Sequence, residues 1–300
     1  MPQRAIRPTR LGHRPFRGSD AIAAGVLTPM QLRGSNWRRL FRDVYVSSAA
    51  RDDHLTRVAG AALVIPAGAL ISGRSAALLW GSKMGDFDGP VEVLTPRRFG
   101  PIAGLAIRSG PVHPADVAER WRMPVCTPLR TCWELARALP ELDAVGWIDA
   151  LGRARRLRKA QLTAESLRHS GAMGSVKATN TLRLCDPRAE SPPESELRVH
   201  IHRYRLPRPV PQYRVFVAGQ FVARVDLAWP DLRFAVEYDG QWHVDPRQLA
   251  DDRVRLRALH AAGWEVFHVT RADMADIARL MRDLGVALDR RRAQGRLALS

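Results

Sequence analysis

The sequence predicts an α/β protein with a basic N-terminal part and a separate C-terminal domain. Strand-like runs alternate with segments of helical apolar period along the chain of 300 residues. A polar, proline-rich stretch at 186–193 ends a helical region and marks a domain boundary. After this stretch the elements follow in the order helix, three strands, helix, strand, helix, which predicts a mixed sheet covered by helices.

The composition is that of a globular protein, with 46% apolar and 26% charged residues. No run of about 18 apolar residues occurs, so we expect no membrane span. The first residues lack the apolar segment of a secretory signal, which predicts a cytoplasmic protein. Cys126, Cys132 and Cys185 have no metal-binding spacing and are expected to be reduced, buried thiols.

The net charge of +17 predicts a polyanionic partner, with DNA as the first candidate. The charge is uneven. Residues 1–42 hold nine arginines and one acid, Asp20, a formal charge of +8. Residues 187–300 hold 19 arginines and 15 acids, a formal charge of +4. The alternative explanation is a compositional bias, because arginine far outnumbers lysine throughout the chain.

Two N-terminal segments are distinguished by their patterns. Residues 1–18 are rich in arginine and proline without an apolar period, which predicts a disordered basic arm. Residues 19–50 predict a winged-helix-like segment with a helix at 20–25, a second helix capped by Thr28, and a strand at 44–46. The alternative is a simple cap on the domain that follows.

Residues 51–186 predict an α/β domain, and residues 187–300 predict the C-terminal domain. In the first, helices are expected from 54, from 73 and from 128 to about 184, and strands at 69–72, 91–95 and 105–108. In the second, helices are expected from 192, over 246–262 and over 272–292, and strands at 213–217, 221–228, 233–239 and 264–270.

Acidic residues follow two neighbouring strands of the C-terminal domain. Asp226 lies between Val225 and Leu227, and Glu237 and Asp239 end the next strand. Carboxylates are poor strand formers and are costly to bury, so a cluster of them favours a bound cation. Mg²⁺ binds one or two carboxylates together with phosphate oxygens. The pattern therefore predicts a metal-dependent site that cleaves phosphodiester bonds.

The C-terminal third resembles the PD-(D/E)xK nuclease superfamily, with a restriction-endonuclease-like core. More narrowly, it is similar to a domain family allied to very-short-patch mismatch repair endonucleases. The matching pieces are Glu190-Ser-Pro-Pro-Glu194, Val225-Asp226-Leu227, Glu237-Tyr-Asp-Gly-Gln-Trp-His243, Asp251-Asp-Arg253 and Ala262-Gly-Trp-Glu-Val.

The resemblance implies a role for each matching residue. Asp226 would be the central ligand of Mg²⁺ or Mn²⁺, with Asp239 and the backbone carbonyl of Tyr238 beside it. His243 would be the general base that activates water, a role that suits a pKa near neutrality. Glu194 would orient the metal-bound water. Glu237 is the remaining candidate catalytic acid.

One departure from the superfamily leaves two alternatives open. Its usual lysine would fall at Asp239, and residues 187–300 contain no lysine. Either His243 replaces the lysine, as in the repair enzymes, or the site is inert. Each residue also has a structural interpretation. Glu237 would pair with Arg224 or Arg233 across the hairpin. Glu194 would favour the first turn of a helix, and the others would cap a turn or pack.

The N-terminal half is similar to abortive-infection antitoxins of toxin–antitoxin systems. The similar pieces are Gly34–Val46, Ser72–Gly81 and Pro124-Val-Cys-Thr-Pro-Leu-Arg-Thr-Cys-Trp-Glu-Leu-Ala. The resemblance implies DNA binding, or a protein partner. The stretch between Leu32 and Trp37 is too short for a full recognition helix. We therefore expect phosphate contacts from Arg38, Arg39 and Arg42 rather than base reading.

The leading hypothesis is a DNA-binding protein whose C-terminal domain is a Mg²⁺-dependent endonuclease. The alternative is a DNA-binding regulator, or an antitoxin-like protein, whose nuclease fold is catalytically inactive.

Overall fold

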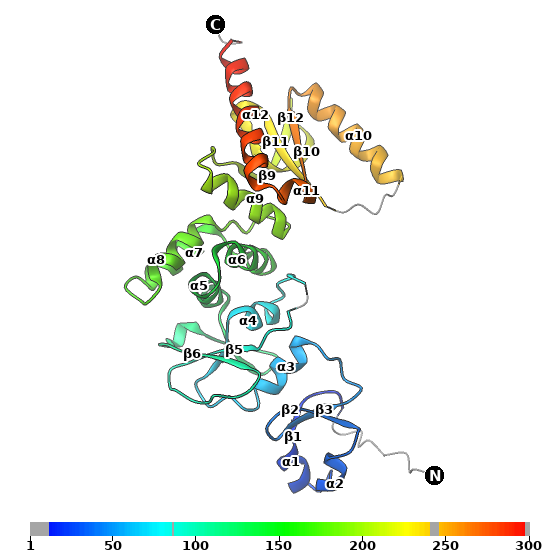
Figure 1. The fold of residues 1–300 in the computed structure, drawn as a ribbon, viewed down its shortest axis with the longest axis vertical. Helices are drawn as coiled ribbons and strands as arrows, with labels where there is room; N and C mark the ends of the chain where they lie inside the picture. Colours follow the sequence, from blue (N-terminus) through cyan, green and yellow to red (C-terminus); the bar gives the residue numbers. More distant parts are fainter. Residues whose placement is uncertain (1–11, 86, 241–245, 298–300) are drawn as a thin grey trace. The chain divides into compact units, whose positions relative to one another are not determined.

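The computed structural model describes residues 12–85, 87–240 and 246–297 (Figure 1). The chain forms two compact units, here called unit 1 (Met1–Ala138 with Ala160–Thr179) and unit 2 (Leu139–Lys159 with Asn180–Ser300). Helices and mixed sheets make up both units, so the predicted α/β class is confirmed.

Unit 1 begins with a small three-stranded antiparallel sheet and two short helices. The elements are β1 (Phe16–Arg17), α1 (Gly18–Ala23), α2 (Pro29–Leu32), β2 (Trp37–Phe41) and β3 (Val44–Ser47), with strand order β1-β3-β2. Thr28 caps α2 as predicted, since its hydroxyl accepts the Gln31 N–H at 3.2 Å. With four residues, α2 is too short to read a DNA groove. The arginines that follow lie on β2 and in the turn after it.

A five-stranded sheet and its surrounding helices form the rest of unit 1. Its elements are α3 (His54–Ala61), β4 (Leu70–Ile71), α4 (Gly73–Leu79), β5 (Val91–Thr95), β6 (Leu105–Ser109), η2 (Pro114–Asp116), β7 (Val117–Arg120), β8 (Met123–Cys126), α5 (Pro128–Ala138) and α7 (Lys159–Arg168). The strand order is β6-β5-β4-β8-β7. The β7–β8 hairpin was not expected from the sequence, because the turn residues Trp121 and Arg122 both adopt positive φ angles that glycine usually supplies.

Unit 2 carries the carboxylates and follows the predicted order of elements. After α6 (Glu141–Arg155) come α9 (Pro192–Arg203), β9 (Val210–Val217), β10 (Gln220–Trp229), η3 (Pro230–Leu232), β11 (Phe234–Asp239), α10 (Pro246–Ala261), β12 (Glu265–Thr270), α11 (Arg271–Met274) and α12 (Ile277–Leu297). The sheet order is β12-β11-β10-β9, with β11 and β12 parallel and the other pairs antiparallel.

The sheet of unit 2 has an apolar core on each face. One core joins Leu197 and Ile201 of α9 and Leu284 of α12 to the strands. The other joins Leu259 of α10 and Trp264 to the opposite face. Figure 1 shows α12 and α10 on the two sides of this sheet. Burial of both faces fixes the strand register, and this register decides where the acidic residues lie.

The structure divides the chain earlier than the boundary predicted at 186. Helix α6 packs against α9 in unit 2, and the division also falls within α8 (Ser175–Leu184). The physical reason is the buried carboxylate of Asp149, which accepts hydrogen bonds from the Ser195 hydroxyl and the Asp186 N–H, both at 2.7 Å, and pairs with Arg198. Burial raises the pKa of Asp149 to about 6. Proline content, from which the boundary was predicted, gives no information about a buried polar contact of this kind.

Two simpler expectations concern the cysteines and the membrane. Cys126, Cys132 and Cys185 are free and buried, as predicted. No described helix combines the length and the apolar character that crossing a membrane requires.

Candidate functional site

Two carboxylates of unit 2 meet at one amide group. Glu194 lies in the first turn of α9, and Asp226 lies on β10. The side-chain amide of Gln212, on β9, donates to Glu194 Oε2 at 2.9 Å and to Asp226 Oδ1 at 3.2 Å. The register of the sheet and the position of α9 therefore bring together two acids that are 32 residues apart in the chain.

Asp226 is electrostatically unfavourable in its ionised form. Its pKa is raised to about 6, first by burial and then by the negative charge of Glu194, with a further contribution from Glu237. Hydrogen bonds from the Tyr238 N–H, at 3.0 Å, and from Gln212 oppose this rise. Among the described residues no arginine, lysine or histidine forms an ion pair with Asp226. A cation bound beside it would relieve this repulsion.

Glu194 is also well placed as a structural residue. Its Oε1 accepts the Ser191 hydroxyl at 2.7 Å, and its Oε2 accepts the Glu190 N–H at 2.9 Å. These bonds are typical of a carboxylate in the first turn of a helix. The side chain is buried, and it shares the Gln212 amide with Asp226. The structural interpretation of Glu194 and the functional one are therefore compatible.

Glu237 is neutralised by an arginine from α10. Arg255 binds it in a two-pronged contact, with Nη2 donating to Oε2 at 2.9 Å and Nη1 donating to Oε1. Sequence reasoning expected a pairing with Arg224 or Arg233. Arg224 instead pairs with Glu190 at 2.8 Å.

Asp239 ends β11 and pairs with His268 of β12, whose Nδ1 lies 3.0 Å from its Oδ2. Both side chains are partly exposed. Because residues two apart on a strand face the same side, Asp239 and Glu237 share a face of β11. In this arrangement Asp239 has a cationic partner of its own when His268 is protonated.

Two further predictions concern Tyr238 and His243. Tyr238 does lie beside Asp226, but its N–H makes the contact, whereas the predicted metal ligand is its carbonyl oxygen. His243 lies outside the described residues, so its predicted role as a general base stays a prediction.

The donor chemistry of the site fits a hard divalent cation only in part. Carboxylate oxygens are the ligands that Mg²⁺ and Mn²⁺ prefer. In the part of the chain that the structure describes, however, Glu194, Asp226 and Glu237 do not offer three ligand atoms that all lie within 4.8 Å of one another. Glu194 and Asp226 are the pair that the shared amide brings together, so the fit concerns these two.

A second acidic cluster, in unit 1, meets that distance criterion. Asp116, Glu165 and His169 have ligand atoms within 4.8 Å of one another. Arginines already occupy this cluster, since Arg130 contacts Asp116 at 2.6 Å and Arg168 contacts both acids. Its charges are balanced within the protein, which favours a structural role.

The N-terminal arginines differ in their partners. Arg38 pairs with Asp52 at 2.7 Å. Arg39 donates from Nε to the carbonyl of Phe41 at 3.2 Å and has no acidic partner in the described chain. Arg42 forms no hydrogen bond or ion pair with any described residue, and its charge acts on the neighbouring Asp43 only by helping to lower that carboxyl's pKa. Of the three predicted phosphate contacts, Arg39 and Arg42 are therefore the ones with charge to spare.

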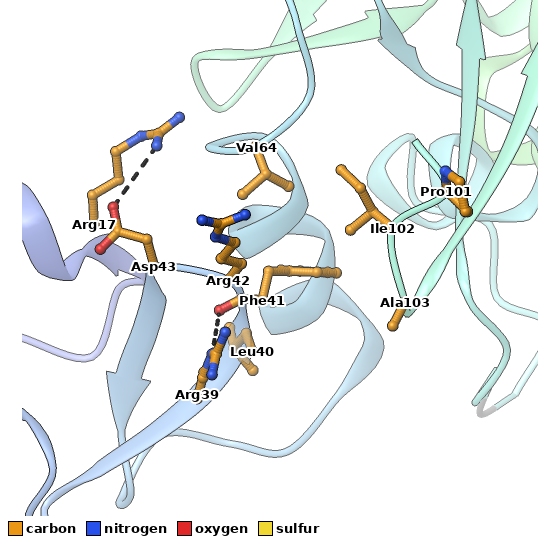
Figure 2. Close-up of a pocket in the computed structure, with 10 residues that line it drawn as sticks. All are labelled: Arg17, Arg39, Leu40, Phe41, Arg42, Asp43, Val64, Pro101, Ile102 and Ala103. Atoms are coloured by element: carbon orange, nitrogen blue, oxygen red, sulfur yellow. Dashed lines mark hydrogen bonds and ion pairs between the residues drawn. The ribbon is translucent and has the colours of Figure 1, made fainter. Parts of the chain in front are cut away.

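Arg39 and Arg42 line an open pocket of about 760 Å³ in unit 1 (Figure 2). Arg17 lines it as well and pairs with Asp43 at 3.9 Å. Figure 2 shows the three arginines on one side and Pro101–Ala103 on the other. A basic opening with an apolar wall suits an anionic group attached to an organic framework.

Sequence reasoning missed three residues of the site in unit 2. Gln212 is uncharged and sits in a proline-rich run, so no pattern marks it. Arg255 lies 18 residues beyond its partner on a different element, and one arginine among 19 carries no signal by itself. The third residue is His268 of β12. The parallel pairing of Glu237 with His268 could have shown that His268 lies near the acids.

Comparisons with known proteins identify relatives but no activity. No protein-family model matches the chain. The uncharacterized proteins MT2308 and Rv2248 of Mycobacterium tuberculosis are each 34% identical to it over 170 residues, which cover 56% of this chain and 63% of each relative. The chain thus spans less than two thirds of their length. The crystal structure of the Rv2827c protein from Mycobacterium tuberculosis aligns with a TM-score of 0.41 and 16% identity, covering 73% of this chain and 92% of that chain.

Proposed function

We propose that this protein binds DNA and hydrolyses its phosphodiester bonds with a divalent ion, Mg²⁺ or Mn²⁺, held by unit 2. The observation that carries the proposal is the shared amide of Gln212, which holds Glu194 of α9 and Asp226 of β10 together. Two carboxylates held this way repel each other, and the raised pKa of Asp226 reflects its burial first and this repulsion second.

Each residue has a distinct task in this proposal. Glu194 and Asp226 supply carboxylate oxygens to the ion, and Gln212 orients both. Arg255 holds Glu237 in place and keeps a guanidinium beside the acids, where it would attract a phosphate. An ion bound there would polarise a scissile phosphate and activate water. Asp239 would join the ligands only by leaving His268, and His243 remains the proposed base.

Nicking of supercoiled plasmid tests this proposal. We expect nicking in Mg²⁺ or Mn²⁺, none in EDTA, and a loss of at least about 100-fold in Asp226→Asn and Glu194→Gln, because a ligand and its orientation are both removed. The matched control is Asp289→Asn, which changes an exposed acid on α12. Nicking that survives EDTA, or that Asp226→Asn retains, would overturn the proposal.

A second function is favoured by one specific observation. Asp239 stands at the position of the superfamily's lysine and pairs with His268, and Arg255 neutralises Glu237. An inactive, DNA-binding regulator would keep such closed ion pairs for structural reasons. DNA binding without nicking in either metal would select this function, and a gel-shift assay beside the plasmid assay would detect it.

The delivery of DNA is proposed to depend on Arg39 and Arg42. Removing one phosphate contact lowers the slope of log K against log salt by about 0.9 for duplex DNA. We expect this change for Arg42→Gln, whose side chain forms no ion pair with an acid among the described residues. Arg38→Gln is the matched control, since Asp52 already compensates Arg38. Equal slopes for Arg42→Gln and the wild type would remove Arg42 from the interface.

A further inference from the structure

The β9–β10 hairpin exposes two aromatic rings side by side. Phe216 and Phe221 pair directly across the strands, their ring centroids are 5.8 Å apart, and each side chain is 53% exposed. Exposed single aromatic residues are ordinary in proteins, but a cross-strand pair is a patch with a defined geometry. Nothing in the core of unit 2 requires these rings, because Val215 and Ala223 fill that role from the opposite face.

A β-bulge produces this exposure. The register shifts between Phe221 and Ala223, so Val222 is the extra residue. In a regular strand Phe221 and Ala223 would face the same side, and Ala223 is buried in the core. The bulge turns Phe221 to the outer face beside Phe216. Bulges commonly redirect a side chain next to a functional site.

The same face carries an uncompensated positive charge. Arg214 and Arg224 stand directly opposite each other on the two strands, an arrangement that is destabilising for like charges. Arg224 pairs with Glu190, but Arg214 has no acidic partner in the described chain. The Arg214 guanidinium lies 5.6 Å from the centroid of Phe216 and 5.1 Å from that of Phe221. An anion above this face would relieve the repulsion.

The patch leads toward the carboxylates. Arg214, Phe221 and Arg224 line one open hollow of about 470 Å³ together with Arg255, the residue that binds Glu237. Its lining is thus three cationic side chains and one aromatic ring. Aromatic rings for stacking, interleaved with arginines for phosphates, are what a strand of unpaired nucleotides needs. In duplex DNA the faces of the bases are stacked on one another, so the two phenylalanine rings would have no base to stack on.

We propose that the outer face of the β9–β10 hairpin binds an unpaired segment of DNA, which stacks bases on Phe216 and Phe221 and places phosphates on Arg214 and Arg224. The choice of DNA as the nucleic acid rests on the proposed function, whereas the binding itself requires neither a metal ion nor catalysis. The surface directs an unpaired strand past Arg255 toward the acids. The substrate class of the site is then DNA with an unpaired segment, such as a flap, gap or frayed end.

Fluorescence anisotropy with a labelled single-stranded oligonucleotide, in EDTA, tests this proposal. The double variant Phe216→Ala/Phe221→Ala should bind the single strand at least about tenfold more weakly, from the stacking energy of one or two bases. Its affinity for a duplex of the same length should change little. Phe216→Tyr/Phe221→Tyr should bind like the wild type, because a tyrosine ring stacks equally well.

Two matched controls separate stacking and charge from general damage. Tyr204→Ala removes another exposed aromatic residue of unit 2 and should leave single-strand binding unchanged. Arg214→Gln should lower the salt slope for single strands by about 0.7, whereas Arg282→Gln, at an exposed arginine of α12, tests for non-specific charge. Thermal unfolding of each variant should match the wild type, since the replaced side chains are largely exposed.

Three outcomes would overturn the inference. The double alanine variant could bind single strands as the wild type does, or lose duplex and single-strand binding equally. It could also lose self-association in sedimentation experiments without any change in DNA binding, which would make the hairpin a contact between copies. The two proposals can fail separately. If the protein nicks DNA and the hairpin variants bind single strands normally, only this inference is wrong. If binding depends on the hairpin but no nicking occurs, only the proposed function is wrong.

Discussion

Asp116 in unit 1 and Asp226 in unit 2 end with pKa values shifted in opposite directions. Burial raises the pKa of Asp116 in unit 1, but the His113 N–H and then Arg130 and Arg168 outweigh it, and the pKa ends below its usual range. Burial also raises the pKa of Asp226 in unit 2, and there Glu194 adds to the rise, to about 6. The residue type is the same, and the neighbours decide the outcome.

The difference between Asp116 and Asp226 lies in whether a guanidinium pairs with the carboxylate. In the buried network of unit 1, Arg130 pairs with Asp116 and Glu134, Arg137 with Glu134, and Arg168 with Asp116 and Glu165. In unit 2 Arg255 serves Glu237, while Asp226 and Glu194 share an amide. Groups with pKa values perturbed in this way gather at functional sites. Geometric convergence alone would have selected the cluster in unit 1.

Replacing the cation of the unit 1 network should give the largest effect. Arg130→Ala leaves Asp116 and Glu134 buried without their guanidinium, and breaking a buried pair in this way costs about 3–5 kcal/mol. We expect a marked fall in the urea midpoint of unit 1. The control is Arg292→Ala, which breaks an exposed pair with Asp289 and should cost no more than about 1 kcal/mol. Similar costs for the two variants would mean that burial of the network is unimportant.

Removing the charge of Asp226 should instead stabilise the protein at neutral pH. An acid with a raised pKa keeps its proton in the folded state after the unfolded state has lost it. This contribution to stability is complete below the unfolded pKa of 3.8 and is lost as pH rises through about 6. Asp226→Asn should therefore gain about 1–3 kcal/mol over the wild type at pH 8, and little at pH 4.

Urea unfolding at the two pH values, in EDTA, measures this gain. Asp116→Asn is the contrasting variant, because the pKa of Asp116 is lowered and its charge is stabilising. That variant should lose stability at pH 8. If Asp226→Asn is less stable than the wild type at pH 8, the electrostatic contrast between the units is wrong.

Divalent ions should stabilise unit 2 through Asp226. A ligand that binds only the folded state at ten times its Kd adds about 1.4 kcal/mol. We expect Mg²⁺ or Mn²⁺ to raise the unfolding temperature of the wild type and to leave that of Asp226→Asn unchanged. Glu165→Gln, in the compensated cluster of unit 1, should keep the full rise. A rise that Glu165→Gln loses and Asp226→Asn retains would move the metal site to unit 1.

The sequence predicted elements well where local chemistry decides them. The Thr28 cap is one example. The turn between the strands predicted at 213–217 and 221–228 contains Gly219, with φ +80°, and the helix predicted over 246–262 is followed by Gly263, with φ +78°. Alternation of apolar residues likewise located β10 and β11 and placed Asp226 near Glu237. These signals are local, so they can be recognised in the sequence without knowledge of the tertiary fold.

The charge partners could not be predicted, because they come from distant elements. Gln212 reaches Asp226 only through the β9–β10 register, and Arg255 reaches Glu237 only after α10 packs on the sheet. The β2 strand was missed for a related reason. Its residues Trp37–Phe41 alternate poorly in burial, and β3 supplies the pairing that makes them a strand. The positions of the acids were therefore predicted from the sequence, but the residues that pair with them were not.

Asp239 should give the smallest effect and the finest test of the contrast. It is partly exposed and pairs with His268, so Asp239→Asn should change the unfolding free energy by no more than about 1 kcal/mol. The informative measurement is the stabilisation by Mg²⁺ in this variant. If Glu194 and Asp226 hold the ion, most of that stabilisation persists, and Asp239 belongs with the compensated acids. If Asp239→Asn abolishes the stabilisation by Mg²⁺, Asp239 leaves His268 on metal binding. In that case β11 carries one acid that stays paired, Glu237, and one that becomes a metal ligand, Asp239.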